Sequence, residues 1–292
     1  MTRKNIQFLL EAVALRVTLS FCRLLGLDRS SALGGWLGRR LGPKLGISRR
    51  ARRNIERAMP ELAPAEVDRI IAAMWENLGR TAFEYAHLDK FSLPENRGRV
   101  ELVGAETLIA RARSGEGGIC ISGHFANWEL MPLIMRLEGL DGGEVYRAAN
   151  NPYVNEWMVN MRREFIVPEQ IAKGPKGARQ LVKAVRDKRF IGMLIDQRLS
   201  EGIEVRLFGI PAMTTPAPAG FAVRYGTAIF PCSIVRTGGA HFRLTVHERV
   251  EVDEGAEPEV EIARVTQLLN DFLEARIREK PEGWFWLHNR WG

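Results

Sequence analysis

From about residue 99 onward, two hydrophobic patterns alternate along the chain, and few architectures accommodate both. Short apolar runs of strand length alternate with stretches whose apolar residues recur every three or four positions, as in amphipathic helices. This alternation predicts an α/β fold with a mixed, largely parallel sheet flanked by helices. The expected strands are Val100–Val103, Gly118–Ser122, Glu144–Ala148, Phe190–Ile195, Ala228–Val235 and His241–Val246, and the expected helices are 104–113, 129–138, 152–164, 176–188, 215–225 and 258–279.

The preceding stretch has a purely helical pattern. Apolar residues form one stripe around Trp36 and another around Met74, with Pro60 and Pro64 between them. The sequence contains no internal repeat, low-complexity tract or linker that would separate a second domain. We therefore expect a membrane-anchoring helix at residues 1–28 and a single catalytic domain at 29–292, divided into a helical lead-in (29–98) and an α/β core (99–292).

The composition excludes several classes of protein. Hydrophobic residues make up 46% of the 292 residues and charged residues 26%, a balance typical of globular domains and not of disordered or collagen-like chains. The three cysteines, Cys22, Cys120 and Cys232, are far apart and form no CxxC pair, so we expect neither disulfides nor a cysteine zinc site. No HExxH or GxxxxGK[ST] motif occurs, so the sequence implies no metal and no nucleotide cofactor.

The N-terminal segment is both apolar and basic. Ile6–Leu27 is an apolar run of 22 residues, but Glu11, Arg16 and Arg23 interrupt it, and each charge would cost about 2.5–3.5 kcal/mol at mid-membrane. The first 57 residues hold thirteen Lys/Arg and three Asp/Glu, a charge of +10, whereas the whole chain carries +7. We therefore expect this helix to lie in, or enter obliquely, the interface of a membrane that contains anionic lipids.

The alternative for this segment is an ordinary amphipathic helix packed on the domain. Nucleic acid is not an expected partner, because the Arg49–Arg53 cluster (RRARR) has no interleaved aromatic residues and no recognition motif follows it. A membrane surface accounts for both the apolar run and the charge.

The most informative motif follows the expected strand Gly118–Ser122. His124 comes directly after Gly123, so we expect it on a turn at the carboxyl edge of the sheet, where α/β proteins bind their ligands. Glu129 is expected in the first turn of the next helix, from which its carboxylate can reach the imidazole. Such a contact fixes the tautomer and raises the basicity of the other ring nitrogen, so the pair predicts a general base and its orienting residue. No nucleophile motif accompanies it, and Cys120 lies inside the apolar run as an inert core residue.

Gly123–Leu130 (GHFANWEL) resembles the H-x4-D/E signature of glycerolipid acyltransferases, in the form carried by the lipid A biosynthesis (late) acyltransferases of lauroyl/myristoyl type. Further blocks resemble the same family in the same order, so the resemblance covers essentially the whole chain. The chain departs from the usual pattern at Ala148, where proline is frequent, and at Arg198, where an acid or asparagine is common. The further blocks are Val145–Tyr153 (VYRAANNPY), Leu194–Gln197 with Phe208–Gly209 and Thr214–Pro216, and Trp286–Trp291 (WLHNRW).

The resemblance implies an acyltransferase at the cytoplasmic face of the inner membrane. It would move a fatty acyl chain from acyl carrier protein, or coenzyme A, to a hydroxyl of a lipid A precursor. His124 would act as general base, Glu129 would orient it, and no covalent acyl-enzyme would form. Both donors are acidic and suit a basic surface. Two alternatives stay open, namely the same fold acting on another lipid or glycolipid acceptor, and a non-catalytic protein that only binds the membrane surface.

Four further residues are expected to bind substrate. Arg147 follows a strand-like run, and its guanidinium suits a phosphate or a developing oxyanion; the alternative is a purely structural arginine. Asp196 ends an expected strand and is expected to pair with Arg147, and Gln197 follows it in the same family-like block. Asn151 is the fourth, although an asparagine before Pro152 also suits the cap of the helix that begins there.

Overall fold

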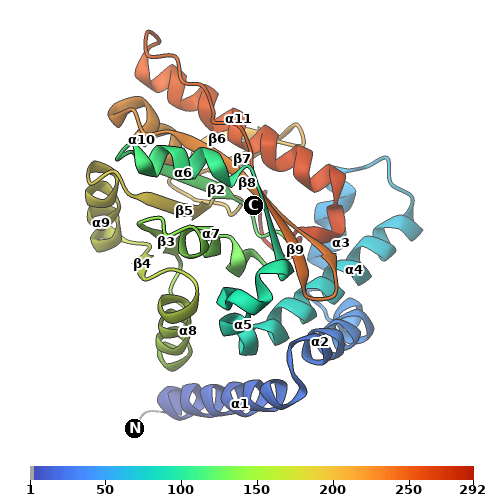
Figure 1. Cartoon of the computed structure of the whole chain (residues 1–292). Coiled ribbons are helices and arrows are strands. Elements are labelled where there is room, and N and C mark those ends of the chain that lie inside the picture. The colour runs from blue at the N-terminus through green and yellow to red at the C-terminus, as the bar shows by residue number, and fades with distance from the viewer. Residues whose placement is uncertain (1–2) are drawn as a thin grey trace.

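A seven-stranded sheet forms the centre of the computed structural model, which describes residues 3–292 (Figure 1). The strand order is β1-β9-β8-β2-β5-β3-β4, and every neighbouring pair is parallel except β8 and β9. The predicted mixed, largely parallel sheet flanked by helices is thus confirmed. The strands are β1 (Val100–Val103), β2 (Gly118–Ser122), β3 (Gly142–Tyr146), β4 (Glu169–Ala172), β5 (Phe190–Leu194), β8 (Ile229–Gly238) and β9 (His241–Val246).

The structure contains three strands that the hydrophobic pattern does not predict. One is β4, a four-residue strand at the edge of the sheet. The other two, β6 (Ile203–Leu207) and β7 (Ile210–Thr214), form a separate antiparallel hairpin. Its two-residue turn, with φ of 57° at Phe208 and 70° at Gly209, has the left-handed conformation typical of tight hairpins. These strands are short and partly exposed, so their apolar signal is weak.

The core helices lie close to their predicted bounds, with one exception. The helix expected at 129–138 is a 3-10 turn, η4 (Trp128–Leu130), followed by a short α-helix. Pro132 explains the break. In a helix starting at residue 129, the fourth residue would donate the first backbone hydrogen bond, but that residue is Pro132, which has no N–H group. The helices are α6 (Ala105–Arg113), α7 (Leu133–Leu137), α8 (Pro152–Phe165), α9 (Pro175–Arg186), α10 (Ala217–Tyr225) and α11 (Pro258–Glu279).

The helical lead-in packs directly against this core. One cluster of buried apolar residues runs from Leu27 to Leu287 and includes side chains of the lead-in helices and of the sheet. Two lead-in helices, α2 and α4, cross with their backbones in contact. Glycines allow this close approach, since a Cβ at Gly38 or Gly79 would collide with a carbonyl group of the other helix. The lead-in helices are α2 (Leu27–Leu41), α3 (Ser48–Ala58), α4 (Pro64–Glu84) and α5 (Leu88–Ser92).

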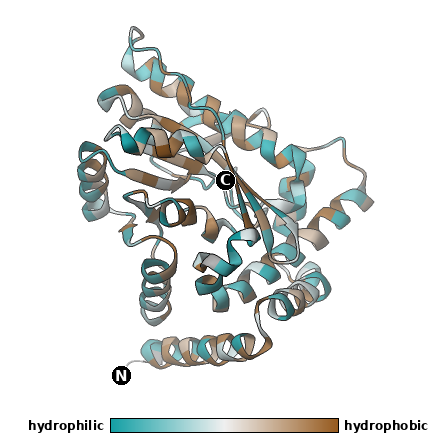
Figure 2. Cartoon of the chain, viewed as in Figure 1, coloured by the Kyte–Doolittle hydropathy of each residue, from teal (hydrophilic) through white to brown (hydrophobic). Residues whose placement is uncertain are grey.

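The first helix, α1 (Arg3–Leu25), lies at the edge of the molecule, below α5 and α8 in Figure 1. One side of it is packed, since Leu19 and Cys22 are buried with Ala86. No helix among the described residues is long and apolar enough to cross a membrane. Figure 2 shows brown, hydrophobic positions along α1. Several apolar residues of this helix are exposed, namely Ile6, Leu9, Leu10, Val13, Val17, Phe21 and Leu24. The membrane anchor therefore stays a prediction, supported by this exposed face.

Candidate active site

His124 lies on the turn after β2, at the carboxyl edge of the sheet, as the sequence predicts. Asp196 follows β5, the parallel neighbour of β2, and the register pairs Ser122 with Leu194. The two residues therefore leave the sheet side by side although 72 positions separate them. Asp196 accepts two hydrogen bonds from His124, from the backbone N–H to Oδ2 and from the ring Nδ1 to Oδ1, each 2.7 Å long.

The Asp196 carboxylate is fully buried and ionised. Trp284 Nε1 donates a third hydrogen bond, 2.8 Å long, to its Oδ2. Burial alone would raise the pKa of Asp196, but the charge and hydrogen bonds of His124 outweigh it and hold that pKa far below its usual range. Because an ionised carboxylate only accepts hydrogen bonds, Nδ1 of His124 donates to it, and Nε2 lies 3.4 Å from the amide nitrogen of Gln197.

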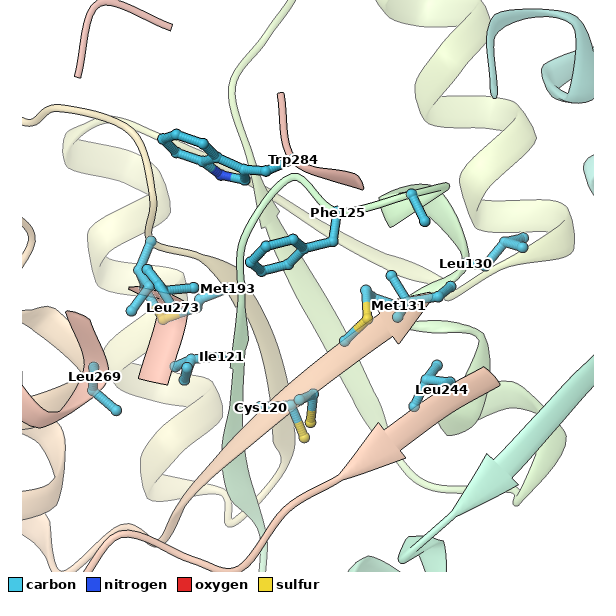
Figure 3. Close-up of a cluster of buried hydrophobic side chains, with 14 of the residues drawn as sticks. Cys120, Ile121, Phe125, Leu130, Met131, Met193, Leu244, Leu269, Leu273 and Trp284 are labelled. Carbon is cyan, nitrogen blue, oxygen red and sulfur yellow. The ribbon is translucent and has the colours of Figure 1, made fainter. Parts of the chain in front are cut away.

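A glycine makes this arrangement possible. A Cβ at Gly123 would lie 3.1 Å from Oδ2 of Asp196 and 2.8 Å from the Phe125 ring, so a larger residue would push the carboxylate away from the His124 N–H. Phe125 also forms a β-bridge with Trp284, and Figure 3 shows their rings near each other over the buried cluster. The C-terminal segment therefore closes over the turn that carries His124.

Helix α4 also contacts this turn. Ala126 has a φ of 44°, which residues other than glycine rarely adopt. Its carbonyl oxygen accepts hydrogen bonds from Asn77 Nδ2 and Thr81 Oγ1, both 3.1 Å long. Asn127 Nδ2 donates to the buried Glu84 at 2.8 Å. These contacts compensate for the strained backbone and fix the position of His124.

Glu129 does not orient His124, so that prediction is wrong. Its carboxylate is buried and pairs with Arg162 of α8, through Nε to Oε2 and Nη2 to Oε1, both at 2.7 Å. Burial would raise the pKa of Glu129, but the charge and hydrogen bonds of Arg162 lower it. The physical reason is that Asp196 already occupies the ring nitrogen, and that Glu129 lies on the η4 turn, from which it reaches α8.

Arg162 has further neighbours inside the protein. Its Nη2 donates to the Tyr85 hydroxyl at 3.0 Å, and its Nε lies 3.7 Å from Oε1 of Glu144 in β3. Burial alone would lower the pKa of Arg162, but Glu129, Tyr85 and Glu144 raise that pKa above the usual range. Burial raises the pKa of Glu144 to about 7, against the opposing effect of Arg162. Arg162 therefore stays positively charged. Glu129 is its hydrogen-bonded acidic partner, and Glu144 is a more distant one.

His288 stands edge-on to His124, with 4.8 Å between the ring centroids. Burial is the main cause that lowers its pKa to about 4, so the ring is neutral at neutral pH. One ligand atom each from His124, Asp196 and His288 lie within 4.8 Å of one another, a spacing that a metal ion could use. Both oxygens of Asp196 already accept hydrogen bonds, however. The group therefore fits proton transfer better than metal binding.

A cavity of about 340 Å³ opens in front of His124, within the usual range of small-molecule sites. Strands β2, β3 and β5 contribute to its walls. Its polar lining residues are Ser122, His124, Glu129, Glu144, Tyr146, Arg147, Asn150, Arg162, Lys173 and Gln197. Its apolar lining includes Cys120, Met131, Pro132, Ile134, Met135, Val145, Met193, Leu194 and Cys232. The cavity can hold an apolar chain whose polar end meets His124.

Of the four predicted substrate-binding residues, two line the cavity and two do not. Arg147 and Gln197 line the cavity. Arg147 is exposed and forms no ion pair with any described residue, so the expected pair with Asp196 is wrong, because His124 and Trp284 occupy that carboxylate. The register of Tyr146 with Ala172 places Arg147 beside Lys173 at the cavity edge.

Asn151 lies outside the cavity lining, as the cap of α8. Its Oδ1 accepts from the N–H groups of Tyr153 and Val154, and its Nδ2 donates to the carbonyl oxygen of Phe8 and to Glu11 of α1, at 2.8 and 3.0 Å. The capping alternative is thus correct, and its amide group is fully used.

Sequence reasoning missed four residues of the site: Arg162, Lys173, Trp284 and His288. Trp284 and His288 lie in or next to the C-terminal block WLHNRW, which could have indicated a role beyond the core. Lys173 follows β4, the strand that the pattern did not predict. Arg162 lies within an expected helix, and no local signal distinguishes it from an exposed helical arginine.

Comparison with known proteins agrees with this geometry. The family model described as bacterial lipid A biosynthesis acyltransferase matches residues 4–292, nearly the whole chain. A search of the curated proteins finds no match.

Proposed function

Since the chain belongs to the bacterial lipid A biosynthesis acyltransferase family, we propose that it transfers a fatty acyl chain from a thioester donor to a hydroxyl of a lipid A precursor. The family is one of acyltransferases, so the enzyme class follows from membership, and the proposal concerns donor, acceptor and mechanism. One observation carries it: the 2.7 Å contact of His124 Nδ1 with a buried, ionised Asp196, at a cavity whose lining is partly polar and partly apolar.

In this mechanism, Nε2 of His124 takes the proton of the acceptor hydroxyl as its oxygen attacks the thioester carbonyl carbon. Asp196 stabilises the imidazolium that forms. The tetrahedral intermediate then collapses, the C–S bond breaks, and the departing thiolate takes the proton back from Nε2. The new ester and a free thiol are the products, and His124 returns to its neutral form.

Direct attack suits the side chains around the site. Ser122 Oγ is buried without a hydrogen-bond partner among residues 3–292, so no base activates it. Cys120 and Cys232 are buried in the apolar part, and a hydrogen bond with Cys120 together with burial raises the pKa of Cys232 well above its usual value. An acyl-enzyme is therefore not part of the proposal.

Arg162 supplies positive charge for the tetrahedral oxyanion, and Glu129 fixes the orientation of its guanidinium. This assigns the H-x4-E glutamate to the arginine and not to the histidine. Arg147 and Lys173, at the cavity edge, suit a phosphate or another acidic part of donor or acceptor.

For the donor we propose acyl carrier protein or coenzyme A, and for the location the cytoplasmic face of the inner membrane. The basic N-terminal region and the exposed apolar face of α1 support a bilayer surface with anionic lipids. The enzyme would then take an amphipathic acceptor directly from that surface.

The test combines an assay with lipid analysis. Purified wild-type protein and His124→Ala are incubated with acyl carrier protein or coenzyme A thioesters and a lipid A precursor, and the product is identified by mass spectrometry. Transfer by the wild type and its loss in a folded His124→Ala protein are expected. Lipid A that is unchanged in a deletion strain would redirect the search to another lipid acceptor.

A further inference from the structure

Glu144 places a carboxyl group in the wall of the cavity, 3.7 Å from Arg162. The register aligns Glu144 of β3 with Gly192 of β5, and Gly192 with Cys120 of β2, and all three residues line the cavity. Cys120 lies four residues before His124 in the chain. Figure 3 shows Cys120, Met131 and Met193 as members of the surrounding apolar cluster.

One oxygen of the Glu144 carboxyl group, Oε1, lacks a hydrogen bond from any described residue. Its side chain is 14% exposed, and Oε1 is buried with no hydrogen-bond partner in the described part of the chain. The nearest cation, Arg162 Nε, lies 3.7 Å from Oε1, beyond hydrogen-bonding distance, whereas Arg162 makes two bonds of 2.7 Å to Glu129. A pKa of about 7 keeps a large share of Glu144 protonated at neutral pH, so it can both donate and accept.

A plain hydrocarbon chain would gain nothing from this group. A buried carboxyl oxygen without a hydrogen bond is costly, and a hydrocarbon chain cannot supply one. There is also room beside it, because the heavy atoms nearest to a Cβ built on Gly192 would lie no closer than 3.7 Å, the distance to Glu144 Cβ. A polar group on the bound chain, opposite Glu144, resolves the mismatch.

We propose that Glu144 hydrogen-bonds a hydroxyl group carried by the acyl chain of the donor, so that the enzyme selects hydroxyacyl chains over unsubstituted chains of equal length. This inference rests on the proposed acyl transfer and assigns the chemical class of its donor. The alternative role of Glu144, a second counter-ion for Arg162, requires its charge but predicts no discrimination between donors.

The experiment is a competition between donors. Wild-type enzyme receives equal amounts of 2-hydroxydodecanoyl, 3-hydroxydodecanoyl and dodecanoyl thioesters of one carrier, and mass spectrometry of the products gives the ratios of kcat/KM. We expect one of the hydroxyacyl donors to be preferred about tenfold, the usual effect of one hydrogen bond to a neutral partner. Glu144→Leu should remove this preference, whereas Glu144→Gln should retain most of it.

The outcomes separate this inference from the proposed function. Absence of a hydroxyacyl preference in the wild type, or a preference that survives in Glu144→Leu, overturns it. A higher acceptor KM in Glu144→Leu with an unchanged donor ratio also overturns it, because the hydroxyl would then belong to the acceptor. Failure of every donor to react would instead refute the proposed acyl transfer. Glu156→Leu, an exposed glutamate of α8 outside the cavity lining, is the matched control and should leave the donor ratio unchanged.

Discussion

Asp196 binds His124 twice, through the backbone N–H and through Nδ1, and both contacts are 2.7 Å long. One carboxylate thus fixes the position of the residue and the tautomer of its ring. Asp196 thus has the contact with His124 that was predicted for Glu129, and Glu129 pairs with Arg162 instead. The predictions below follow from this division of roles.

Asp196→Asn should lower kcat by about 10²–10⁴, because the amide cannot stabilise the imidazolium and allows the wrong tautomer. His124→Ala should lose at least as much. Steady-state rates of proteins whose circular dichroism matches the wild type provide the measurement. Wild-type turnover by either folded variant would refute the proposed base.

Removal of Glu129 should destabilise the protein more than removal of both partners of its ion pair. Glu129→Ala leaves the buried Arg162 without its main counter-ion, a change that typically costs about 3–5 kcal/mol, whereas replacing a buried pair by apolar residues is often neutral. Denaturant unfolding of Glu129→Ala and Glu129→Leu/Arg162→Met tests this. Equal stability of the two variants would contradict the assignment, and both should be inactive.

Arg147→Ala should lower activity without lowering the melting temperature, because Arg147 lines the cavity edge and has no ion pair among the described residues. Arg147→Lys should fall between wild type and Arg147→Ala, since the charge stays but the two-pronged geometry is lost. Initial rates and thermal melts are measured side by side. A parallel fall of rate and melting temperature would indicate a structural arginine.

His288 should make the protein less stable in acid. Its pKa is about 4 in the folded state against about 6.5 in an unfolded chain, so the unfolded state binds more protons between these values. Stability therefore falls as the pH drops from about 6.5 to 4, by roughly 3 kcal/mol at most. His288→Phe should lose less stability than wild type between pH 7 and pH 4.5 in urea unfolding. The opposing titration of Glu144 is present in both proteins and cancels.

The exposed face of α1 should hold the protein on membranes, and its packed face should not. Replacing Leu10, Val17 and Leu24, which are 64%, 64% and 87% exposed, by serine removes apolar contact but leaves the buried Leu19 and Cys22 in place. We expect the triple variant to shift to the supernatant in vesicle flotation with its activity on short soluble acceptors retained. Deletion of residues 1–28 should release it as well.

High salt should extract only part of the wild-type protein, since screening weakens the basic contacts but not apolar burial. Complete extraction by salt would show that charge alone holds the protein. Unchanged flotation of the triple variant would assign the exposed face another partner.

Much of the α/β core could be predicted because its signals are local. Strands β1, β2 and β9 have the predicted bounds, and α11 does too, since strand and helix periodicity depend only on neighbouring residues. The wrong helix at 129–138 and the missed strands also have local causes. Pro132 interrupts a helix whose apolar pattern continues past it, and β4, β6 and β7 are too short or too exposed to give a clear pattern.

The position of His124 at the end of a buried strand was determined by the chain locally, and so was the capping role open to Asn151. The partners of the site residues were not, because they depend on which strands and helices become neighbours. Asp196 reaches His124 since β5 pairs with β2, and Glu129 reaches Arg162 since α8 packs against the η4 turn. Spacing along the chain cannot reveal such contacts, because a carboxylate pairs with the cation or ring that the tertiary fold brings within hydrogen-bonding distance.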